Sequence, residues 1–489
     1  MLFYDWLTSA VKVKGSAKAL IYRDTYLSWR GLLHRVNRRS EEFAQMGVGS
    51  GDLVGLMLGN VPDFVILSLA LSKLNAAPVP LDPTTSVREL DMLMSIIPLR
   101  GLITRPRGGD APLPTAQPGQ EGTRHRAPET RRRLQGTLLS CSIYPASESI
   151  NVGQEANNVA AVLVTTDSAG DPKPVERTVD NLRAEAKHLH ELLKITADDR
   201  ALLTVPLFHA FGFDLGFVGC FSAKAALYLE DEIAPARIIK LVREQKITIL
   251  PGNHSMFAEV GQLPASRPLA HQPRLLSLGG GLTGSALEGF KKRYGVRPLS
   301  CFHTTETGTI AVDLKGQAGE TVGKALPGIE VRVTNAKTGK PTSNGRKGVL
   351  WIRSPSVSPL ILGNRGQATP DGIAVGHVDD EGWFRTGDLA SVDRAHRLTL
   401  RGREDDLVRL EGKQVALGEV EGCIESFPKV TAAQAELITD PLGGPMVIAR
   451  VVLRPSRGKK IEPEAIIDHC ARNLAPYKVP RRIEFCESL

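Results

Sequence analysis

Two charged side chains near residue 400 have the types and the spacing to bind the hydroxyl groups of one sugar ring. Asp388 ends the turn-like segment 382–388 (Gly-Trp-Phe-Arg-Thr-Gly-Asp), and Arg403 follows fifteen residues later, directly after Gly402. A carboxylate can accept from two neighbouring hydroxyls and a guanidinium can donate to them, in strong charge-assisted hydrogen bonds. The pattern predicts a ribose site, although Thr-Gly-Asp by itself is typical of an ordinary turn.

A second segment, at 165–175, carries the groups that hold a polyphosphate. It reads Thr-Thr-Asp-Ser-Ala-Gly-Asp-Pro-Lys-Pro-Val and follows an apolar stretch at 160–164 that predicts a buried strand. Backbone N–H groups, hydroxyls and a lysine at one turn are donors for phosphate oxygens. The segment differs from the loop of nucleotide hydrolases, which needs Gly-x-x-x-x-Gly-Lys followed by Ser or Thr. The residues expected to contact phosphate are Thr165, Thr166, Ser168, Gly170 and Lys173.

Taken together and in this order, the two segments and the residues after Arg403 resemble the adenylate-forming superfamily, which includes acyl-CoA synthetases, luciferases and peptide-synthetase adenylation domains. The resemblance covers nearly the whole chain. It implies an ATP-dependent ligase that joins a small carboxylic acid to AMP with loss of pyrophosphate. The acyl group then passes to a thiol, either of CoA or of the phosphopantetheine on an acyl carrier protein. Mg²⁺ is the implied metal.

The phosphate segment departs from the superfamily's signature at two positions. Asp167 stands where the signature has a glycine, and Ala169 stands where it has a threonine. A carboxylate close to a phosphate is repelled by about 4 kcal/mol at an effective dielectric near 20, and the backbone freedom of glycine is also lost. Asp167 could point away or carry a metal; otherwise the loop is degenerate and binds triphosphate poorly.

The segment 206–212 (Pro-Leu-Phe-His-Ala-Phe-Gly) resembles the part of acyl-CoA synthetases that separates the acyl pocket from the nucleotide. The resemblance gives His209 this dividing, catalytic position and makes Phe211 and Phe213 walls of the acyl pocket. A histidine packed at a strand end is the simpler alternative. Further on, Gly280 and Gly281 match the wall beside adenine, and Gly281 would also face the acyl group; without side chains, they let a flat ring approach.

The segment 301–306 (Cys-Phe-His-Thr-Thr-Glu) resembles the superfamily's Tyr-Gly-x-Thr-Glu. Phe302 takes the place of a tyrosine that stacks on adenine and keeps the aromatic face. His303 replaces the glycine, which would narrow the nucleotide or acyl cleft. Thr305 and Glu306 match and are implied catalytic residues, with Glu306 as an oxygen ligand of Mg²⁺. Outside this context, Thr-Thr-Glu-Thr would indicate a helix cap.

The resemblance also implies a hinge at Asp405, about which a small C-terminal domain swings between the two half-reactions. In the loop that follows, Gly412 would lie close to the pantetheine of the thiol substrate. Relatives carry an adenylation lysine in x-Gly-Lys a short step beyond the segment that matches 475–485. This chain stops at Leu489, before that step. We expect a chain truncated or excised from a longer polypeptide; alternatively, the protein never had the lysine.

Alternating strand and helix patterns must position these groups. They predict an α/β fold: a large body at 1–404, built of layered and mostly parallel sheets, and a small, apparently incomplete α+β domain at 405–489. Short alternating strands from 323 to 404 predict a mostly β subdomain. In the C-terminal domain we expect helices at 418–427 and 463–474 and strands at 431–438 and 446–453.

Composition narrows the class of protein. A chain of 489 residues with 42% hydrophobic and 23% charged residues is typical of two or three globular domains. Of the net charge of +8, half lies in 105–133, where seven arginines face three acidic residues among several prolines. We therefore expect a flexible insertion at 103–136; contact with a polyanion or an anionic membrane is the alternative. No segment resembles a nucleic-acid-binding motif.

We expect the protein to be located in the cytoplasm. The N-terminus lacks the pattern of a secretory signal, and no apolar stretch approaches the roughly 20 residues that span a bilayer. The six cysteines are widely separated, as suits a reducing compartment. Two other functions stay open because of the departures at 167, 169 and 303: a non-catalytic nucleotide- or acyl-binding homologue, and an enzyme that uses this scaffold for altered chemistry.

Overall fold

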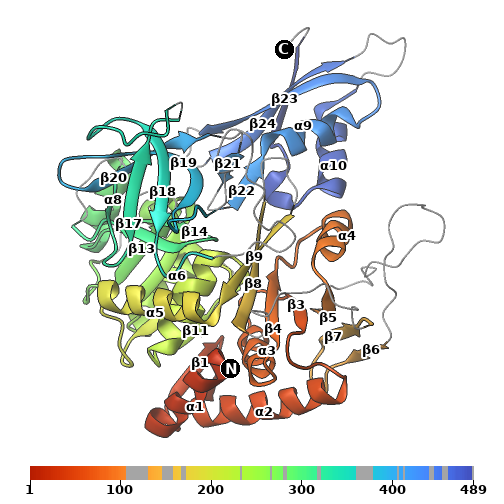
Figure 1. Ribbon diagram of the computed structural model, residues 1–489, viewed down its shortest axis with the longest axis vertical. Coiled ribbons are helices and arrows are strands. Elements are labelled where there is room, and N and C mark those ends of the chain that lie inside the picture. Colours follow the sequence, from red (N-terminus) through yellow and green to blue (C-terminus); the bar gives the residue numbers. More distant parts are fainter. Residues whose placement is uncertain are drawn as a thin grey trace.

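The computed structural model describes most of the chain. The described residues are 1–105, 130–145, 158–166, 172–231, 234–264, 267–278, 284–315, 321–336, 338–358, 378–404, 407–410, 413–439, 445–453 and 461–486. In these ranges an α/β body is joined to a smaller C-terminal unit, which confirms the predicted fold class (Figure 1).

A 13-stranded sheet forms most of the body. Its first part is parallel and contains β1 (Lys18–Tyr22), β11 (Ala226–Leu229), β10 (Arg200–Leu203), β12 (Ile249–Asn253), β13 (Arg274–Leu278) and β14 (Leu299–Thr304). The π-helix η2 (Gly212–Cys220), α6 (Pro235–Glu244), α7 (His254–Gln262) and α8 (Gly284–Tyr294) connect the consecutive strands from β10 to β14, and α5 (Val179–Leu193) leads into β10. Since parallel strands need such crossovers, the predicted strand–helix alternation is confirmed here.

The other part of this sheet is antiparallel. It contains β15 (Gly308–Val312), β16 (Thr321–Ala325), β20 (Arg397–Arg403), β19 (Phe384–Val392), β18 (Gly348–Arg353) and β17 (Glu330–Thr334). A further antiparallel strand, β2 (Thr25–Ser28), forms the opposite edge beside β1. The change from parallel to antiparallel pairing occurs between β14 and β15, so the turn that joins them marks the border of the two parts.

A second, five-stranded sheet has the order β4 (Ala77–Leu81), β3 (Leu53–Met57), β5 (Leu99–Thr104), β7 (Ser140–Ile143) and β6 (Thr130–Arg133). With it lie α1 (Leu2–Lys14), α2 (Trp29–Gln45), α3 (Pro62–Lys73) and α4 (Val87–Ile96). Every residue of α3 from Phe64 to Ser72 is buried, which makes this helix part of the main core.

The flexible insertion expected at 103–136 overlaps regular strands at both of its ends. β5 continues to Thr104, and β6 begins at Thr130 and pairs with β7. The residues between lie outside the described ranges. β6 is an exposed edge strand of one threonine and three arginines, and such charge discourages pairing with the edge of another sheet.

The C-terminal unit has its own apolar core beneath a three-stranded sheet. The sheet contains β23 (Val430–Thr439), β24 (Pro445–Leu453) and β25 (Arg482–Cys486), and α9 (Leu417–Glu425), α10 (Pro463–Asn473) and the 3₁₀ turn η3 (Pro476–Lys478) accompany it. A hairpin of β21 (Leu407–Leu410) and β22 (Lys413–Ala416) lies between this unit and the body (Figure 1). Within the described ranges, no helix has both the length and the apolar character required to cross a membrane.

Candidate active site

The predicted phosphate segment forms an antiparallel hairpin of β8 (Val159–Thr166) and β9 (Pro172–Thr178). Thr165 pairs with Lys173 across the hairpin, so a hydroxyl and an ammonium group flank its tip. The tip itself, which holds Asp167, Ser168, Ala169 and Gly170, lies outside the described residues. The same is true of Gly280, Gly281, Asp405 and Gly412, so their expected roles remain predictions.

Glu306 lies beside this hairpin, in the turn between β14 and β15. Lys173 Nζ is 3.3 Å from Glu306 Oε1, and both side chains are largely buried. Burial by itself would raise the pKa of Glu306, but the charges of Lys173 and Arg403 and several hydrogen bonds outweigh it and lower this pKa. Glu306 therefore stays ionised, as a ligand of a hard cation must be. The predicted phosphate lysine and the predicted metal ligand are brought together.

Asp388 and Arg403 pair directly across β19 and β20. Arg403 Nη1 donates to Asp388 Oδ1 at 3.1 Å, and Asp388 is 3% exposed. The charge of Arg403 also acts on Glu306, which places the predicted ribose pair and the predicted metal ligand in one electrostatic environment. The sequence prediction that these groups share a site therefore has a geometric basis, while their contacts with a nucleotide remain predictions.

A cavity of about 320 Å³ opens between the body and the C-terminal unit. Its lining from the body is Thr204, Val205, Pro206, His209, Gly252, Asn253, Met256, Glu259 and Leu278, and its lining from the C-terminal unit is Leu410, Lys413 and Tyr477. His209 thus lines a cavity, which is compatible with the expected position between the acyl pocket and the nucleotide. Its Nδ1 accepts from the backbone N–H of Phe211 at 3.2 Å, which leaves Nε2 as the protonated ring nitrogen.

Three aromatic rings expected to line the site are instead covered by core side chains. Phe211 is 1% exposed, and Phe213 and Phe302 are fully buried. Phe213 packs against Phe3 and Phe217 with ring centroids 5.9 and 5.4 Å apart. With these side chains buried, their expected contacts with adenine and the acyl group stay predictions.

Gly212 explains why this aromatic segment sits so deep. A Cβ atom at Gly212 would lie 2.2 Å from the carbonyl oxygen of Pro206, so only glycine permits the close turn from β10 into η2. The sequence identified the aromatic residues but not the direction in which this turn sends them.

Two ion pairs fasten the C-terminal unit to the body. Lys413 Nζ is 2.6 Å from Asp82 Oδ2, and its ammonium group lies 4.2 Å from the centre of the Tyr477 ring. Lys478 Nζ is 2.8 Å from Glu89 Oε1 of α4 and 2.9 Å from Glu419 Oε1 of its own unit. Burial alone would lower the pKa of Lys478, but Tyr477, Glu89 and Glu419 raise it, so the lysine stays charged.

Lys413 and Tyr477 are site residues that sequence reasoning missed. Lys413 directly follows Gly412, which the resemblance places near pantetheine, and Tyr477 lies in the segment 475–485 that matches relatives. Nothing local indicates that they meet at one cavity, because the contact depends on how the C-terminal unit docks.

Known proteins resemble the chain along its whole length. Residues 7–362 match the AMP-binding enzyme family, and residues 419–489 match the AMP-binding enzyme C-terminal domain. A putative acyl-CoA synthetase of Bacillus subtilis is 25% identical, with 96% of this chain and 90% of that protein aligned. A medium-chain fatty-acid–CoA ligase of Escherichia coli is 26% identical, with 91% and 79% aligned.

Solved structures share the fold. An amide bond synthetase from Marinactinospora thermotolerans gives a TM-score of 0.81 at 22% identity and covers 100% of this chain and 96% of its own. The o-succinylbenzoate CoA synthetase of Bacillus subtilis gives 0.78 at 20% identity, with 99% and 95% covered. The expected resemblance to adenylate-forming enzymes is confirmed, and this chain belongs to the family of AMP-binding enzymes.

Proposed function

We propose that this protein uses ATP to activate a small carboxylic acid as its acyl-adenylate and then transfers the acyl group to a thiol. The observation that carries the proposal is the ion pair of Lys173 with Glu306, whose ionisation Arg403 of the adjacent ribose pair also favours. These residues offer binding groups for a triphosphate, a divalent cation and a ribose close to one another. The curated relatives above are acyl-CoA and fatty-acid–CoA ligases by name, which supports the same activity.

Each charged group has a role in this proposal. Lys173 offers a point charge to the phosphates, with Thr165 and Thr166 as hydroxyl donors beside it. Asp388 accepts from the ribose hydroxyls, and Arg403 holds Asp388 in place. Glu306 can serve as an oxygen ligand of Mg²⁺ because it is ionised, and the phosphates would then take over its contact with Lys173. When bound, Mg²⁺ would neutralise phosphate charge as pyrophosphate departs.

In the first half-reaction, the protein's contribution is chiefly position and electrostatics. The carboxylate oxygen of the acid forms a bond to the α-phosphorus of ATP, and the bond from that phosphorus to the departing pyrophosphate breaks. Lys173 stabilises charge that develops on the phosphates during this exchange. His209 lines the cavity, where its ring can face the acyl end of the substrate.

We assign the docked orientation of the C-terminal unit to the second half-reaction. The hairpin of β21 and β22 contributes Leu410 and Lys413 to the cavity, and Tyr477 completes that side. The thiol would enter along this hairpin, where its sulfur attacks the acyl carbon and AMP leaves. The apolar lining from Val205, Met256 and Leu278 favours an uncharged, partly apolar acyl group. The acceptor is CoA or a carrier-protein pantetheine, and both belong in the test.

Pyrophosphate exchange tests the proposal most directly. Purified protein, ATP, Mg²⁺ and labelled pyrophosphate are incubated with a panel of carboxylic acids, and label entering ATP is measured. Exchange that depends on one class of acid, followed by thioester formation on adding CoA or a carrier protein, is the expected result. Tight binding of ATP or of a stable acyl-adenylate mimic without exchange would instead favour a non-catalytic binding protein. Absence of both binding and exchange would overturn the proposal.

A further inference from the structure

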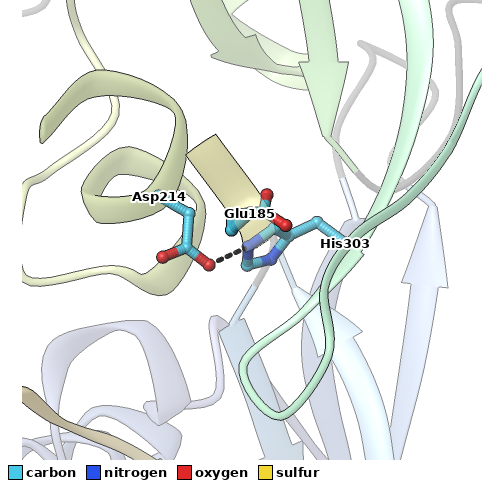
Figure 2. Close-up of side chains that lie close together, drawn as sticks. All are labelled: Glu185, Asp214 and His303. Carbon is cyan, nitrogen blue, oxygen red and sulfur yellow. Dashed lines mark hydrogen bonds and ion pairs between the residues drawn. The ribbon is translucent and has the colours of Figure 1, made fainter. Parts of the chain in front are cut away.

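Four polar side chains meet in the interior directly behind the turn that carries Glu306. Glu185 on α5, Asp214 on η2 and His303 on β14 lie close together (Figure 2), and Arg177 on β9 joins them. We call these four residues the buried quartet. Arg177, Asp214 and Glu185 are fully buried, and His303 is 4% exposed. Polar groups so deep in a core are costly unless they are hydrogen-bonded or paired.

Hydrogen bonds connect Asp214 to two other members of the quartet. Asp214 Oδ2 accepts from Arg177 Nη1 at 2.9 Å and lies 3.0 Å from His303 Nε2. Although burial by itself would raise the pKa of Asp214, the Arg177 charge and the His303 contact lower it, so Asp214 is ionised and His303 donates from Nε2. Burial and the nearby Asp214 charge raise the pKa of Glu185, which favours its neutral form. The charge of Asp214 is therefore compensated by Arg177 within the quartet.

Two members of the quartet also form hydrogen bonds with the backbone of the turn between β14 and β15. Arg177 Nη1 donates to the carbonyl oxygen of Thr305 at 3.0 Å, and Glu185 Oε1 accepts from the backbone N–H of Thr309 at 3.0 Å. Gly308 has φ +75°, and a Cβ atom there would lie 2.3 Å from Glu185 Oε2. The carboxyl of Glu185 thus packs directly on the turn's backbone, where only glycine fits.

The segment 354–358 also forms hydrogen bonds with the backbone of this turn. Ser358 N donates to the carbonyl oxygen of Glu306 at 2.7 Å, and Ser356 Oγ donates to that of Thr307 at 2.8 Å. Together with the Arg177 contact, three successive carbonyls at 305, 306 and 307 each have a fixed partner. A turn whose backbone is held at these three carbonyls has little freedom to shift the side chains that it carries.

We propose that Arg177 and Glu185 are positioning residues that hold the 304–309 turn so that the Glu306 carboxylate is presented to Mg²⁺. The proposal rests on the proposed function, because it takes Glu306 as the metal ligand. Neither residue needs to touch substrate; each acts through the turn's backbone. A carboxylate preset for its cation loses less freedom on binding than one on a mobile turn, so these contacts should appear as Mg²⁺ affinity.

A metal ion inside the quartet is the competing explanation. Ligand atoms of Glu185, Asp214 and His303 all lie within 4.8 Å of one another, which is close enough to share an ion. The Arg177 guanidinium already occupies Asp214, however, and a divalent cation would leave a net positive charge in the core. Metal analysis of the purified protein separates the two: a stoichiometric transition metal that is lost in His303→Ala would overturn our assignment.

The decisive variants are a matched pair at Glu185. Glu185→Gln keeps a neutral side chain with an acceptor for Thr309 N–H, whereas Glu185→Leu removes the acceptor at similar volume. The double variant Arg177→Met/Asp214→Asn removes both charges together, so that neither is left buried and unpaired. As a control, Arg39→Met/Glu42→Gln removes another buried ion pair, in α2, far from the turn in sequence.

Two measurements are made on each variant. Amide hydrogen exchange of the peptide that contains residues 304–309 reports the rigidity of the turn without any need for activity. The Mg²⁺ dependence of pyrophosphate exchange separates the half-saturating Mg²⁺ concentration from the rate at saturation. We expect Glu185→Leu and the double quartet variant to speed amide exchange and to raise half-saturating Mg²⁺ roughly 10-fold, which is the scale of one lost hydrogen bond. Glu185→Gln should resemble the wild type.

The outcomes differ for each way in which the reasoning can fail. If Glu185→Leu lowers thermal stability as the α2 control does but leaves turn exchange and Mg²⁺ dependence unchanged, the quartet is merely structural and the proposal is wrong. If the wild type shows no pyrophosphate exchange with any acid, the proposed function fails. The hydrogen-exchange comparison of Glu185→Gln with Glu185→Leu then still decides whether the quartet rigidifies the turn.

Discussion

Replacing Glu89 by glutamine should loosen the contact between the C-terminal unit and the body while leaving both folded. Glu89 Oε1 accepts from Lys478 Nζ at 2.8 Å, across the two units. Its other oxygen, Oε2, accepts from Ser86 N and Oγ at 3.0 Å in the capping box that begins α4. Glutamine also forms capping boxes, so Glu89→Gln keeps the helix cap and removes only the charge that meets Lys478.

The size of the effect follows from burial and from the partner that remains. The side chains of Lys478 and Glu89 are 5% and 13% exposed, so water screens their interaction little. A hydrogen bond between charged groups contributes about 1.5–3 kcal/mol. The larger cost of stranding a buried charge, about 3–5 kcal/mol, does not apply because Glu419 stays 2.9 Å from Lys478. We expect docking to weaken by about 1.5–3 kcal/mol, roughly 10- to 100-fold in the docking equilibrium.

The two half-reactions provide the assay. If the docked orientation serves thiol transfer, Glu89→Gln should slow single-turnover thioester formation from preformed acyl-adenylate, while pyrophosphate exchange stays equal or rises. Small-angle X-ray scattering should show a larger mean dimension as the unit detaches. Asp82→Asn removes another interdomain carboxylate, which lies 2.6 Å from Lys413, and should act in the same direction. Glu41→Gln, at an exposed position of α2, is the matched control.

The reasoning would be refuted if Glu89→Gln left both half-reactions and the scattering profile as in the wild type. The ion pair would then contribute nothing to docking. A parallel loss in both half-reactions, together with a lower melting temperature, would show instead that the substitution disturbs α4 and that the cap argument is wrong.

Three further outcomes are expected. Glu306→Gln should raise the Mg²⁺ needed for pyrophosphate exchange and slow it roughly 100-fold, because one charged ligand is lost beside Lys173; an unchanged Mg²⁺ titration would contradict this. Asp388→Asn should raise KM for ATP about 10-fold with little change in kcat, since it weakens ribose binding in ground and transition states alike; a kcat effect alone would contradict it. Burial and the Asp214 charge raise the pKa of Glu185 from 4.5 to about 8. Between these pH values Glu185 is ionised in the unfolded chain but protonated in the folded protein. The free energy of unfolding should therefore fall as the pH rises, by up to about 1.4 kcal/mol per pH unit. Chemical unfolding across this range should show that slope in the wild type and a shallower one in Glu185→Gln, and equal slopes would count against the shift.

Local sequence patterns were sufficient to predict contacts between residues of one strand or of two consecutive strands. Asp388 and Arg403 could be paired from the sequence because β19 and β20 are consecutive strands, whose register brings the two residues opposite each other. The strand expected at 446–453 and the helix expected at 463–474 agree with the structure to within one residue at each end, since period and burial are properties of a single element. These patterns, with the family resemblance, determined the fold class and the expected chemistry.

Tertiary structure decided what depends on distant parts of the chain. The buried quartet draws on residues 177, 185, 214 and 303, which lie on four elements. The cavity takes Lys413 and Tyr477 from a unit that two ion pairs dock against the body. Likewise, only the tertiary structure shows that Phe302 is buried within the main core cluster. No local rule could specify these placements, because the order of strands in the sheet and the docking of the units are set by packing over the whole molecule.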